Sequence, residues 1–196
     1  MRVLYLVRHS LTEANERRLY YGWTDLPLSG AGRALALETA AKHPLPACDL
    51  YVTSGMRRAD ETLGLLAGRK PDAALPELKE MNFGAFEMRG YPELKDDPDY
   101  RRWIDDLLNS GDARCPGGES PAEFHSRVLR GGEALLALDW NAALAVVHGG
   151  TIANLMSAWF PEAGQSFYEW QPEPCGGWRV TFKGTAPLSF DAMQED

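Results

Sequence analysis

Cysteine and long apolar runs are scarce in this 196-residue chain. Its three cysteines, Cys48, Cys115 and Cys175, are widely spaced and include no Cys-x-x-Cys pair, which argues against a disulfide framework or a zinc finger. No apolar stretch approaches the roughly 20 residues of a membrane-spanning helix. The chain begins directly with a strand-like segment rather than a secretory signal. We therefore expect a cytoplasmic protein without membrane association.

Positive charge is also in deficit. The chain has 20 lysines and arginines against 28 aspartates and glutamates, for a net charge of −8, which argues against a general role in binding nucleic acid. An anionic ligand would need a local cluster of arginines. With 44% hydrophobic and 24% charged residues, the composition is typical of a globular protein. The length predicts a single domain over residues 1–196.

Strand-like and helix-like segments alternate along the chain, which predicts a three-layer α/β/α sandwich with a mostly parallel central sheet. The expected strands are Val3–Val7, Leu50–Thr53, Ala73–Leu78, Ala142–Val147 and Trp178–Phe182. The expected helices are Ala31–His43, Met56–Ala67, Pro98–Asn109, Glu119–Leu138 and Thr151–Trp159, with Ser29 and Ser54 as N-caps. Glycine, proline and acidic residues at about 85–118 predict a short helical insertion over the active-site edge of the sheet.

Three expected strands end in residues suited to anion chemistry. Arg8 and His9 follow the first strand, Ser54 and Arg58 the second, and His148 the strand Ala142–Val147. Alone, Arg8 and His9 are equally well interpreted as ordinary strand-end residues, and His148 is better interpreted as a core or strand-end histidine. However, the carboxyl ends of parallel strands share one edge of the sheet, where ligands bind in α/β folds. Helix N-termini at this edge add N–H groups for an anion.

Two histidines and two arginines at one edge suit phosphoryl chemistry. A guanidinium group matches phosphate oxygens, and a neutral imidazole can carry a phosphoryl group covalently. Arg8 and Arg58 would disfavour a charged His9 and so keep it nucleophilic. Positioning and charge stabilisation by such groups need no metal or other cofactor. Glu80 follows the strand Ala73–Leu78, where it would be either a general acid or a solvated loop carboxylate.

Six segments, in order and spacing, carry a resemblance to a known family. They are RHSLTEAN at 8–15, GWTDLPLSGAG at 22–32, SGMRRADET at 54–62, LKEMNFG at 78–84, PGGES at 116–120 and VVHGG at 146–150. The chain resembles the histidine phosphatase superfamily, in its phosphoglycerate mutase-like branch. The third segment matches that family's Ser-x-Leu-x-Arg-Ala-x-x-Thr motif with Arg58, rather than Arg57, at the arginine position.

The resemblance implies a role for each site residue. His9 would be the phosphorylated nucleophile, and Glu80 the proton donor that later activates water. The phosphoryl group would be held by Arg8, Arg58 and His148, with help from Asn15. Tyr21 and Gly22 would line the substrate mouth. Ser10 stands where the family usually has glycine, so its backbone could be strained if a positive φ were needed, or its hydroxyl could join the site.

With 196 residues and a short insertion, the chain resembles the compact phosphatases of the family more than the longer mutases. Its PGGES segment resembles that of the broad-specificity and α-ribazole phosphatases. We therefore predict a metal-independent phosphomonoesterase that acts on a small phosphorylated metabolite. Phosphoglycerate mutase-type transfer and a catalytically weak phosphate-recognition module are the alternatives. Tyr91, Tyr100 and Trp103 favour a ring-bearing substrate or form the hydrophobic underside of the insertion. The substrate and the oligomeric state stay open.

Overall fold

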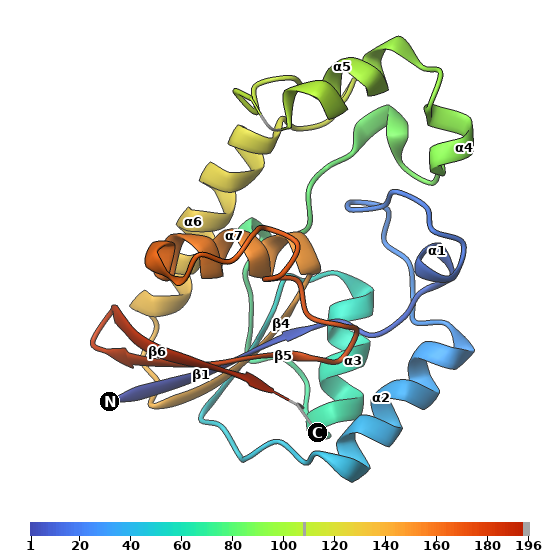
Figure 1. Cartoon of the computed structure of the whole chain (residues 1–196). Coiled ribbons are helices and arrows are strands. Elements are labelled where there is room, and N and C mark those ends of the chain that lie inside the picture. Colours follow the sequence, from blue (N-terminus) through green and yellow to red (C-terminus); the bar gives the residue numbers. More distant parts are fainter. Residues whose placement is uncertain (108, 194–196) are drawn as a thin grey trace.

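A six-stranded β-sheet forms the centre of the molecule (Figure 1). The computed structural model describes residues 1–107 and 109–193. The strands are β1 (Arg2–Arg8), β2 (Leu50–Thr53), β3 (Ala73–Ala74), β4 (Ala142–Val147), β5 (Gly177–Lys183) and β6 (Ala186–Met193). They lie in the order β3-β2-β4-β1-β5-β6, and only the two pairings that involve β5 are antiparallel. The predicted, mostly parallel sheet is confirmed.

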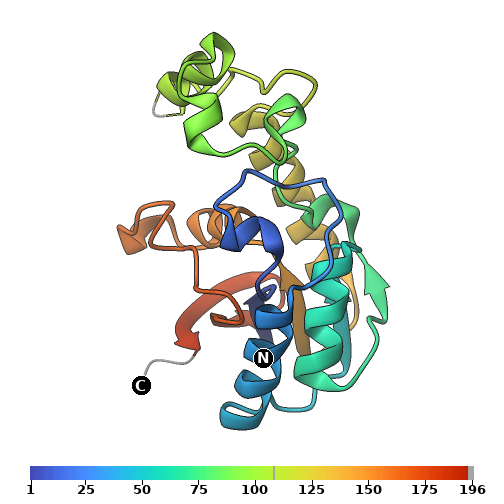
Figure 2. The ribbon, with the colours of Figure 1, turned by 90° about the vertical axis from the view of Figure 1, so that its right-hand side faces the viewer.

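Helices cover both faces of this sheet, as the two views in Figures 1 and 2 show. Helices α2 (Gly30–Lys42) and α3 (Arg57–Ala67) pack together on one face, and α6 (Pro121–Ala137) and α7 (Gly149–Trp159) on the other. The shorter elements are α1 (Glu13–Glu16), α4 (Tyr91–Leu94), α5 (Pro98–Asp106) and the 3₁₀ turns η1 (Pro76–Leu78), η2 (Gly84–Phe86) and η3 (Pro161–Ala163). Within the described residues, no helix is both long and apolar enough to cross a membrane.

The apolar strands are buried on both faces. Ala145 and Val147 of β4 pack into the core beneath α6 and α7, whereas Leu144 and Val146 pack into the core beneath α3. Since successive side chains of a strand point to opposite faces, a strand between two helical layers must be apolar throughout. This burial holds β4 and its neighbour β1 rigidly, and their carboxyl ends carry the two histidines of interest.

Two predicted boundaries are wrong for identifiable reasons. The strand expected over Ala73–Leu78 ends at Ala74, and the 3₁₀ turn η1 starts at Pro76, because proline has no N–H for the sheet ladder. Ser54 is not the N-cap of α3, which is Met56 without a side-chain cap. The Ser54 hydroxyl instead lies within hydrogen-bond distance of His148.

Helices α6 and α7 begin at Pro121 and Gly149, whereas Glu119 and Thr151 were the expected starts. The other differences lie mainly in surface segments. Helix α1, with Thr12 in a capping box, helix α4 and the edge strand β6 were not predicted. Helix α5 begins at Pro98 as expected and ends at Asp106 rather than Asn109; Leu108, within that predicted span, lies outside the described residues. These missed elements are short or exposed and lack a clear apolar period, which is the main signal available from sequence.

The Gly131-Gly132 pair in α6 has a packing role. A Cβ atom at Gly131 would lie 2.6 Å from Leu78 Cδ2, and one at Gly132 would lie 2.6 Å from Leu155 Cδ2. The two glycines therefore let α6 approach both η1 and α7 closely, which offsets their poor helix propensity. This contact matters for the site because η1 leads directly into Glu80.

The insertion stands apart from the sheet and rests on the loop that follows β1 (Figure 2). Tyr20 of that loop exchanges backbone hydrogen bonds with Met88 and Arg89 of the insertion. Its ring also packs against Tyr100 and Trp103, both of which are buried. These two aromatic residues therefore form the hydrophobic underside of the insertion.

Candidate active site

The two histidines meet because β1 and β4 pair in parallel register. Arg8 is opposite Val147 in the sheet, and the backbone N–H of His9 donates to the carbonyl of Val147 at 2.9 Å. The residues just beyond the two strands, His9 and His148, are therefore neighbours. Their ring centroids are 5.1 Å apart in an edge-on arrangement, and both side chains are buried.

His9 has a defined proton position. Its Nδ1 lies 2.6 Å from the carbonyl oxygen of Ser10, which can only accept, so Nδ1 carries the hydrogen and Nε2 keeps its lone pair. Burial, followed by the Arg58 cation and then Arg8, lowers the pKa of His9 well below its usual value, against the opposing hydrogen bond with Ser10. At neutral pH the ring is thus uncharged and nucleophilic at Nε2.

His148 is held as the opposite tautomer. Nε of Arg58 donates to Nδ1 of His148 at 3.3 Å, which leaves the proton on Nε2, 2.8 Å from the hydroxyl of Ser54. Burial, and next the Arg58 cation, hold the pKa of His148 well below its usual value. The site therefore contains two neutral imidazoles. Ser54, which follows β2 at the predicted edge of the sheet, thus lies beside His148 instead of capping α3.

Arg58 is a fully buried cation in the first turn of α3. Its terminal nitrogens donate to the carbonyls of Gly22 at 2.7 Å and Thr24 at 3.2 Å, and its guanidinium lies 4.8 Å from the centre of the Tyr21 ring. Among the described residues, no carboxylate forms an ion pair with Arg58. A buried charge without a counter-ion is costly, so the site is electrostatically prepared for an anion.

Arg8 supplies a second cation at the end of β1. One terminal nitrogen of Arg8 donates to the carbonyl of Pro172 at 2.9 Å, while its buried Nε has no partner in the part of the chain that is described. The guanidinium lies against the start of α7, where a Cβ at Gly149 would be 3.4 Å from Arg8 Nε, an ordinary contact distance. An unused buried donor beside two histidines is available to an anionic ligand.

Glu80 lies at the same edge of the sheet. Its Oε1 accepts the N–H of Met81 and its Oε2 accepts the N–H of Gly150, both at 2.9 Å. A Cβ atom at position 150 would be 2.5 Å from Oε1, so only glycine permits this approach. Burial raises the pKa of Glu80, against the lowering effect of these two N–H groups and of Arg58. A raised pKa increases the protonated fraction available to a general acid.

Asn15, Tyr21 and Gly22 border these groups. Oδ1 of Asn15 accepts from the Tyr21 hydroxyl at 2.6 Å and from the backbone and side chain of Thr12. Its carbonyl side is thus occupied, and its NH₂ group is the side left for a ligand. Gly22 is required sterically, because a Cβ there would lie 1.7 Å from the Met81 carbonyl oxygen.

Ser10 serves the fold at this position. Its hydroxyl donates to the carbonyl of Gly32 in α2 at 2.7 Å, and its N–H donates to Thr62 at 3.0 Å. Ser10 is not among the described residues with positive φ, so serine causes no backbone strain there. Its hydroxyl is directed to α2 rather than to the histidine pair.

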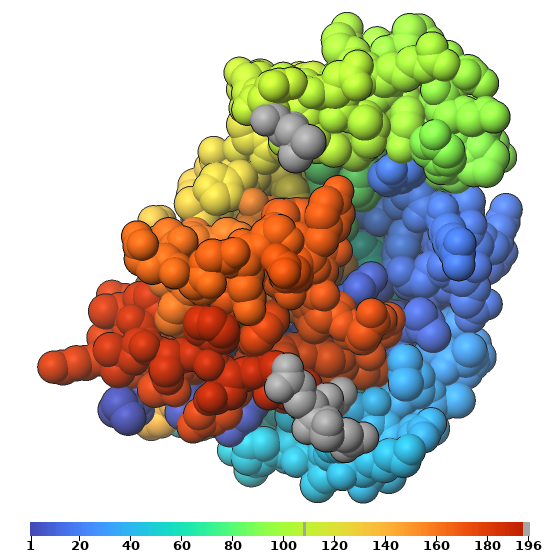
Figure 3. All heavy atoms as spheres, in the orientation of Figure 1, coloured from blue at the N-terminus to red at the C-terminus, as the bar shows by residue number. Residues whose placement is uncertain are grey.

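On the face shown in Figure 3 the surface is hollowed between the insertion (green), the loop after β1 (blue) and the segment that includes α7 (orange). The described residues include no group of three or more His, Cys, Asp or Glu side chains placed to hold a metal ion.

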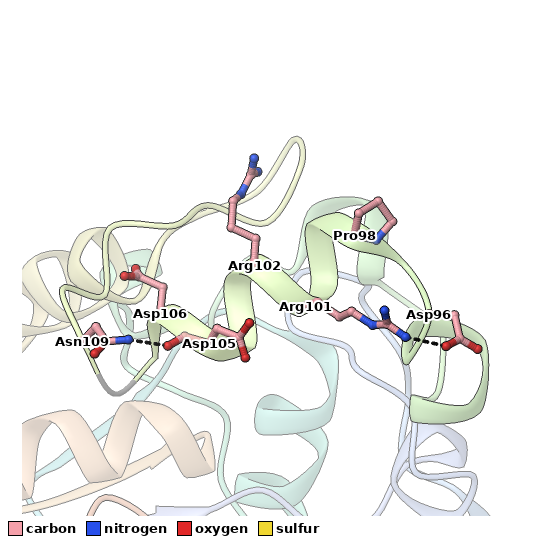
Figure 4. A pocket seen from close by; sticks show the side chains of 7 residues that line it. All are labelled: Asp96, Pro98, Arg101, Arg102, Asp105, Asp106 and Asn109. Carbon is pink, nitrogen blue, oxygen red and sulfur yellow. Dashed lines mark hydrogen bonds and ion pairs between the residues drawn. The ribbon is translucent and has the colours of Figure 1, made fainter.

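A separate concavity of about 540 Å³ lies along α5 (Figure 4). It is lined by Asp96, Pro98, Arg101, Arg102, Asp105, Asp106 and Asn109. None of the predicted site residues lines it. Its two arginines pair with acidic neighbours, Arg101 with Asp96 at 2.6 Å and Arg102 with Asp99 at 3.1 Å. This concavity is therefore not part of the histidine site.

Comparison with known proteins decides the family. The family model of the histidine phosphatase superfamily (branch 1) matches residues 4–189. The chain belongs to the histidine phosphatase superfamily. The predicted family and the predicted enzyme class, a phosphatase that acts on phosphate monoesters of small metabolites, are thereby confirmed.

Relatives within the superfamily have two kinds of names. An adenosylcobalamin/α-ribazole phosphatase of Salmonella typhimurium is 38% identical over 161 residues, which cover 79% of this chain and 77% of the relative. A 2,3-bisphosphoglycerate-dependent phosphoglycerate mutase of Xanthobacter autotrophicus is 30% identical over 164 residues, with 74% and 79% covered. The crystal structure of the α-ribazole phosphatase from Shigella flexneri superposes with a TM-score of 0.87 at 25% identity and covers 98% of this chain and 96% of that one.

Proposed function

We propose that this enzyme hydrolyses phosphate monoesters through a phosphohistidine intermediate on Nε2 of His9. The observation that carries the proposal is the tautomer of His9. Its Nδ1–H is fixed on the Ser10 carbonyl, so a neutral nitrogen lone pair lies in a buried site next to the Arg58 cation, which has no counter-ion among the described residues. Such an arrangement attracts an anionic phosphate and attacks it.

In the first step, Nε2 of His9 forms a bond to phosphorus while the bond from phosphorus to the leaving oxygen breaks. Protonated Glu80 donates its proton to that oxygen and becomes a carboxylate. Arg8, Arg58 and His148 surround the phosphoryl oxygens and stabilise their charge, with the NH₂ group of Asn15 as a further donor. The raised pKa of Glu80 favours the protonated form that this step consumes.

In the second step, a water molecule attacks the phosphohistidine and the bond from phosphorus to Nε2 breaks. The Glu80 carboxylate takes a proton from that water, which restores its acid form and releases inorganic phosphate. His9 returns to the neutral state that burial and the two arginines favour. The cycle uses side chains of this chain alone.

A small organic leaving group without a second strong anion fits the insertion best. Within the described residues, each insertion arginine is already paired with a carboxylate: Arg89 with Asp97, Arg101 with Asp96, Arg102 with Asp99, and Arg114 with Glu123. A phosphoglycerate carboxylate would have to compete with these pairs. We therefore favour a substrate of the type named for the α-ribazole phosphatase relatives, a phosphorylated nucleoside-like metabolite.

Phosphoglycerate mutase activity is the second candidate, because relatives with that name match the chain over similar lengths.

A panel of phosphate monoesters, ranked by kcat/KM and assayed in excess chelator, tests the proposal. The panel includes 2- and 3-phosphoglycerate, scored separately for transfer and for release of phosphate. We expect phosphate monoesters with an uncharged organic leaving group to be hydrolysed fastest, and this activity to be abolished in His9→Ala. Interconversion of phosphoglycerates faster than phosphate release would establish the mutase instead. Phosphate binding without turnover would establish a recognition module.

A further inference from the structure

The Pro116–Ser120 segment of the sequence has no role in the steps above, yet its Glu119 lies next to the loop that carries Glu80. Glu119 forms a bidentate ion pair with Arg127 of α6, with both nitrogen–oxygen distances at 2.7 Å. Both side chains are largely buried, at 15% and 12% exposure. The pair is therefore well shielded from solvent, unlike the exposed ion pairs of the insertion.

Every remaining N–H of the Arg127 guanidinium donates to the backbone before or at Glu80. One terminal nitrogen donates to the carbonyls of Glu77 at 2.8 Å and Lys79 at 2.9 Å, and the other to the carbonyl of Glu80 itself at 3.0 Å. On the far side of Glu80, the Glu119 carboxylate accepts the N–H of Asn82 at 2.8 Å. The Glu119–Arg127 pair thus hydrogen-bonds to the backbone of the loop on both sides of Glu80.

This loop needs such a support. Strand β3 ends at Ala74, η1 ends at Leu78 and η2 begins at Gly84, so residues 80–82 lie outside every strand and helix and their backbone groups must be satisfied in another way. The Glu80 carboxylate in turn depends on the loop, because Oε1 is held by the N–H of the next residue, Met81. A shift of the backbone would move the carboxyl group away from its second anchor, Gly150.

We propose that Arg127 and Glu119 are positioning residues that fix the Glu80 carboxyl group at the leaving oxygen. The proposal rests on the proposed role of Glu80 as proton donor. The proposal predicts that the loss of either residue affects substrates differently according to the basicity of their leaving group. An alkyl alcohol is a poor leaving group and needs the proton from Glu80, whereas 4-nitrophenolate leaves readily without it. Misplacement of Glu80 should therefore slow alkyl phosphates far more than 4-nitrophenyl phosphate.

The test compares kcat/KM for an alkyl phosphate and for 4-nitrophenyl phosphate, since this quantity reports the first phosphoryl transfer. Glu80→Gln sets the reference. We expect Arg127→Met to lower the alkyl-to-aryl ratio of kcat/KM by on the order of tenfold or more, in the same direction as Glu80→Gln. Arg127→Lys, which keeps the charge but cannot reach all three carbonyls, should give a smaller drop. Added to Glu80→Gln, Arg127→Met should cause no further drop in the ratio.

Arg130→Met is the matched control. Arg130 lies on α6 close to Arg127 but is exposed, and its side chain donates to the Ser126 carbonyl, so its ratio should equal that of the wild type. Equal losses on both substrates in Arg127→Met would mean a merely structural role and would overturn the proposal. If Arg127→Met does not fold, kcat/KM of Glu119→Gln is measured with the same two substrates, and the same outcomes apply. A Glu80→Gln variant with an unchanged ratio would instead refute the acid role of Glu80.

Discussion

Arg58 donates its Nε–H to Nδ1 of His148 at 3.3 Å, so that the buried cation and the second histidine form one unit. The same cation lowers the pKa of both His148 and His9. The charge that would bind a phosphoryl group thus also keeps the nucleophile neutral. In the proposed mechanism, phosphate binding and the nucleophilicity of His9 would thus both depend on Arg58, and the first prediction follows from this dependence.

Removal of the Arg58 charge should move the acid side of the pH–rate profile upward. In the wild type, His9 stays neutral well below its usual pKa, so we expect kcat/KM to hold as pH falls below about 6.5. In Arg58→Met the pKa of His9 rises toward its usual value, and kcat/KM should fall off at higher pH. Thr24→Ala, which leaves the Arg58 charge in place, is the control. An unchanged acid limb in Arg58→Met would contradict the assignment of His9 as the titrating nucleophile.

Folding stability should fall with acidity in a defined window. His9 and His148 have lowered pKa values in the folded state, so between those values and about 6.5 the unfolded chain binds more protons than the folded one. The free energy of unfolding should therefore decrease as pH drops below about 6.5. Urea unfolding at several pH values measures this slope. His148→Asn should flatten it, and an equally steep slope in that variant would count against the buried neutral state of His148.

Glu87 should prove important for stability although it touches none of the predicted reacting groups. Its carboxylate accepts the N–H groups of Gly22, Trp23 and Thr24 and the Thr24 hydroxyl at distances of 2.6–3.1 Å. This loop supplies the carbonyls that hold Arg58. In Glu87→Gln one acceptor oxygen becomes a donor, so we expect a loss of about 1–3 kcal/mol for each N–H left unpaired, together with weaker binding of phosphate. Thermal unfolding and inhibition by inorganic phosphate measure the two effects. Glu93→Gln is the control. Equal melting temperatures and equal phosphate inhibition in the two variants would refute the role of Glu87 in holding this loop.

Two glycine-to-alanine variants should have opposite effects. In Gly22→Ala the new Cβ would lie 1.7 Å from the Met81 carbonyl oxygen, so we expect destabilisation by several kcal/mol and loss of activity. In Gly30→Ala, at the start of α2, the new Cβ meets nothing within 4 Å, and alanine should stabilise the helix by up to about 1 kcal/mol. Melting temperatures distinguish them. A tolerated Gly22→Ala would show that the loop after β1 is not held against Met81.

Ser10→Gly should leave catalysis nearly unchanged. The Ser10 hydroxyl donates to Gly32, so its removal should cost about 1 kcal/mol of stability, with little change in kcat/KM. Ser10→Ala removes the hydroxyl while keeping the Cβ, and should lose a similar amount of stability. If either variant lowered kcat/KM more than tenfold, a direct role for this hydroxyl in the site would be required.

The residues that follow strands could be predicted, because strand geometry alone brings them together. Once β1 and β4 are recognised as parallel neighbours, Arg8 and Val147 pair and the histidines after them must meet. Ser54 is placed at this edge in the same way, since it follows β2 directly, but its contact with His148 is a side-chain detail that the sequence does not report. Glu87 and Arg127 could not, because each acts on backbone groups that lie far away in sequence and no local pattern reports such contacts. The edge strand β6 contains Pro187 and was missed because proline within a run argues against a strand unless the run is an edge.

The phosphohistidine on His9 is the central claim, and rapid quenching tests it most directly. The enzyme is mixed with an excess of 4-nitrophenyl phosphate, quenched in base within the first turnovers and analysed by mass spectrometry and ³¹P nuclear magnetic resonance. We predict one phosphoryl group per chain, bonded to Nε2 of His9, and none in His9→Ala. A phosphoryl group on His148 or at Nδ1 of His9, or turnover without any covalent intermediate, would contradict the account.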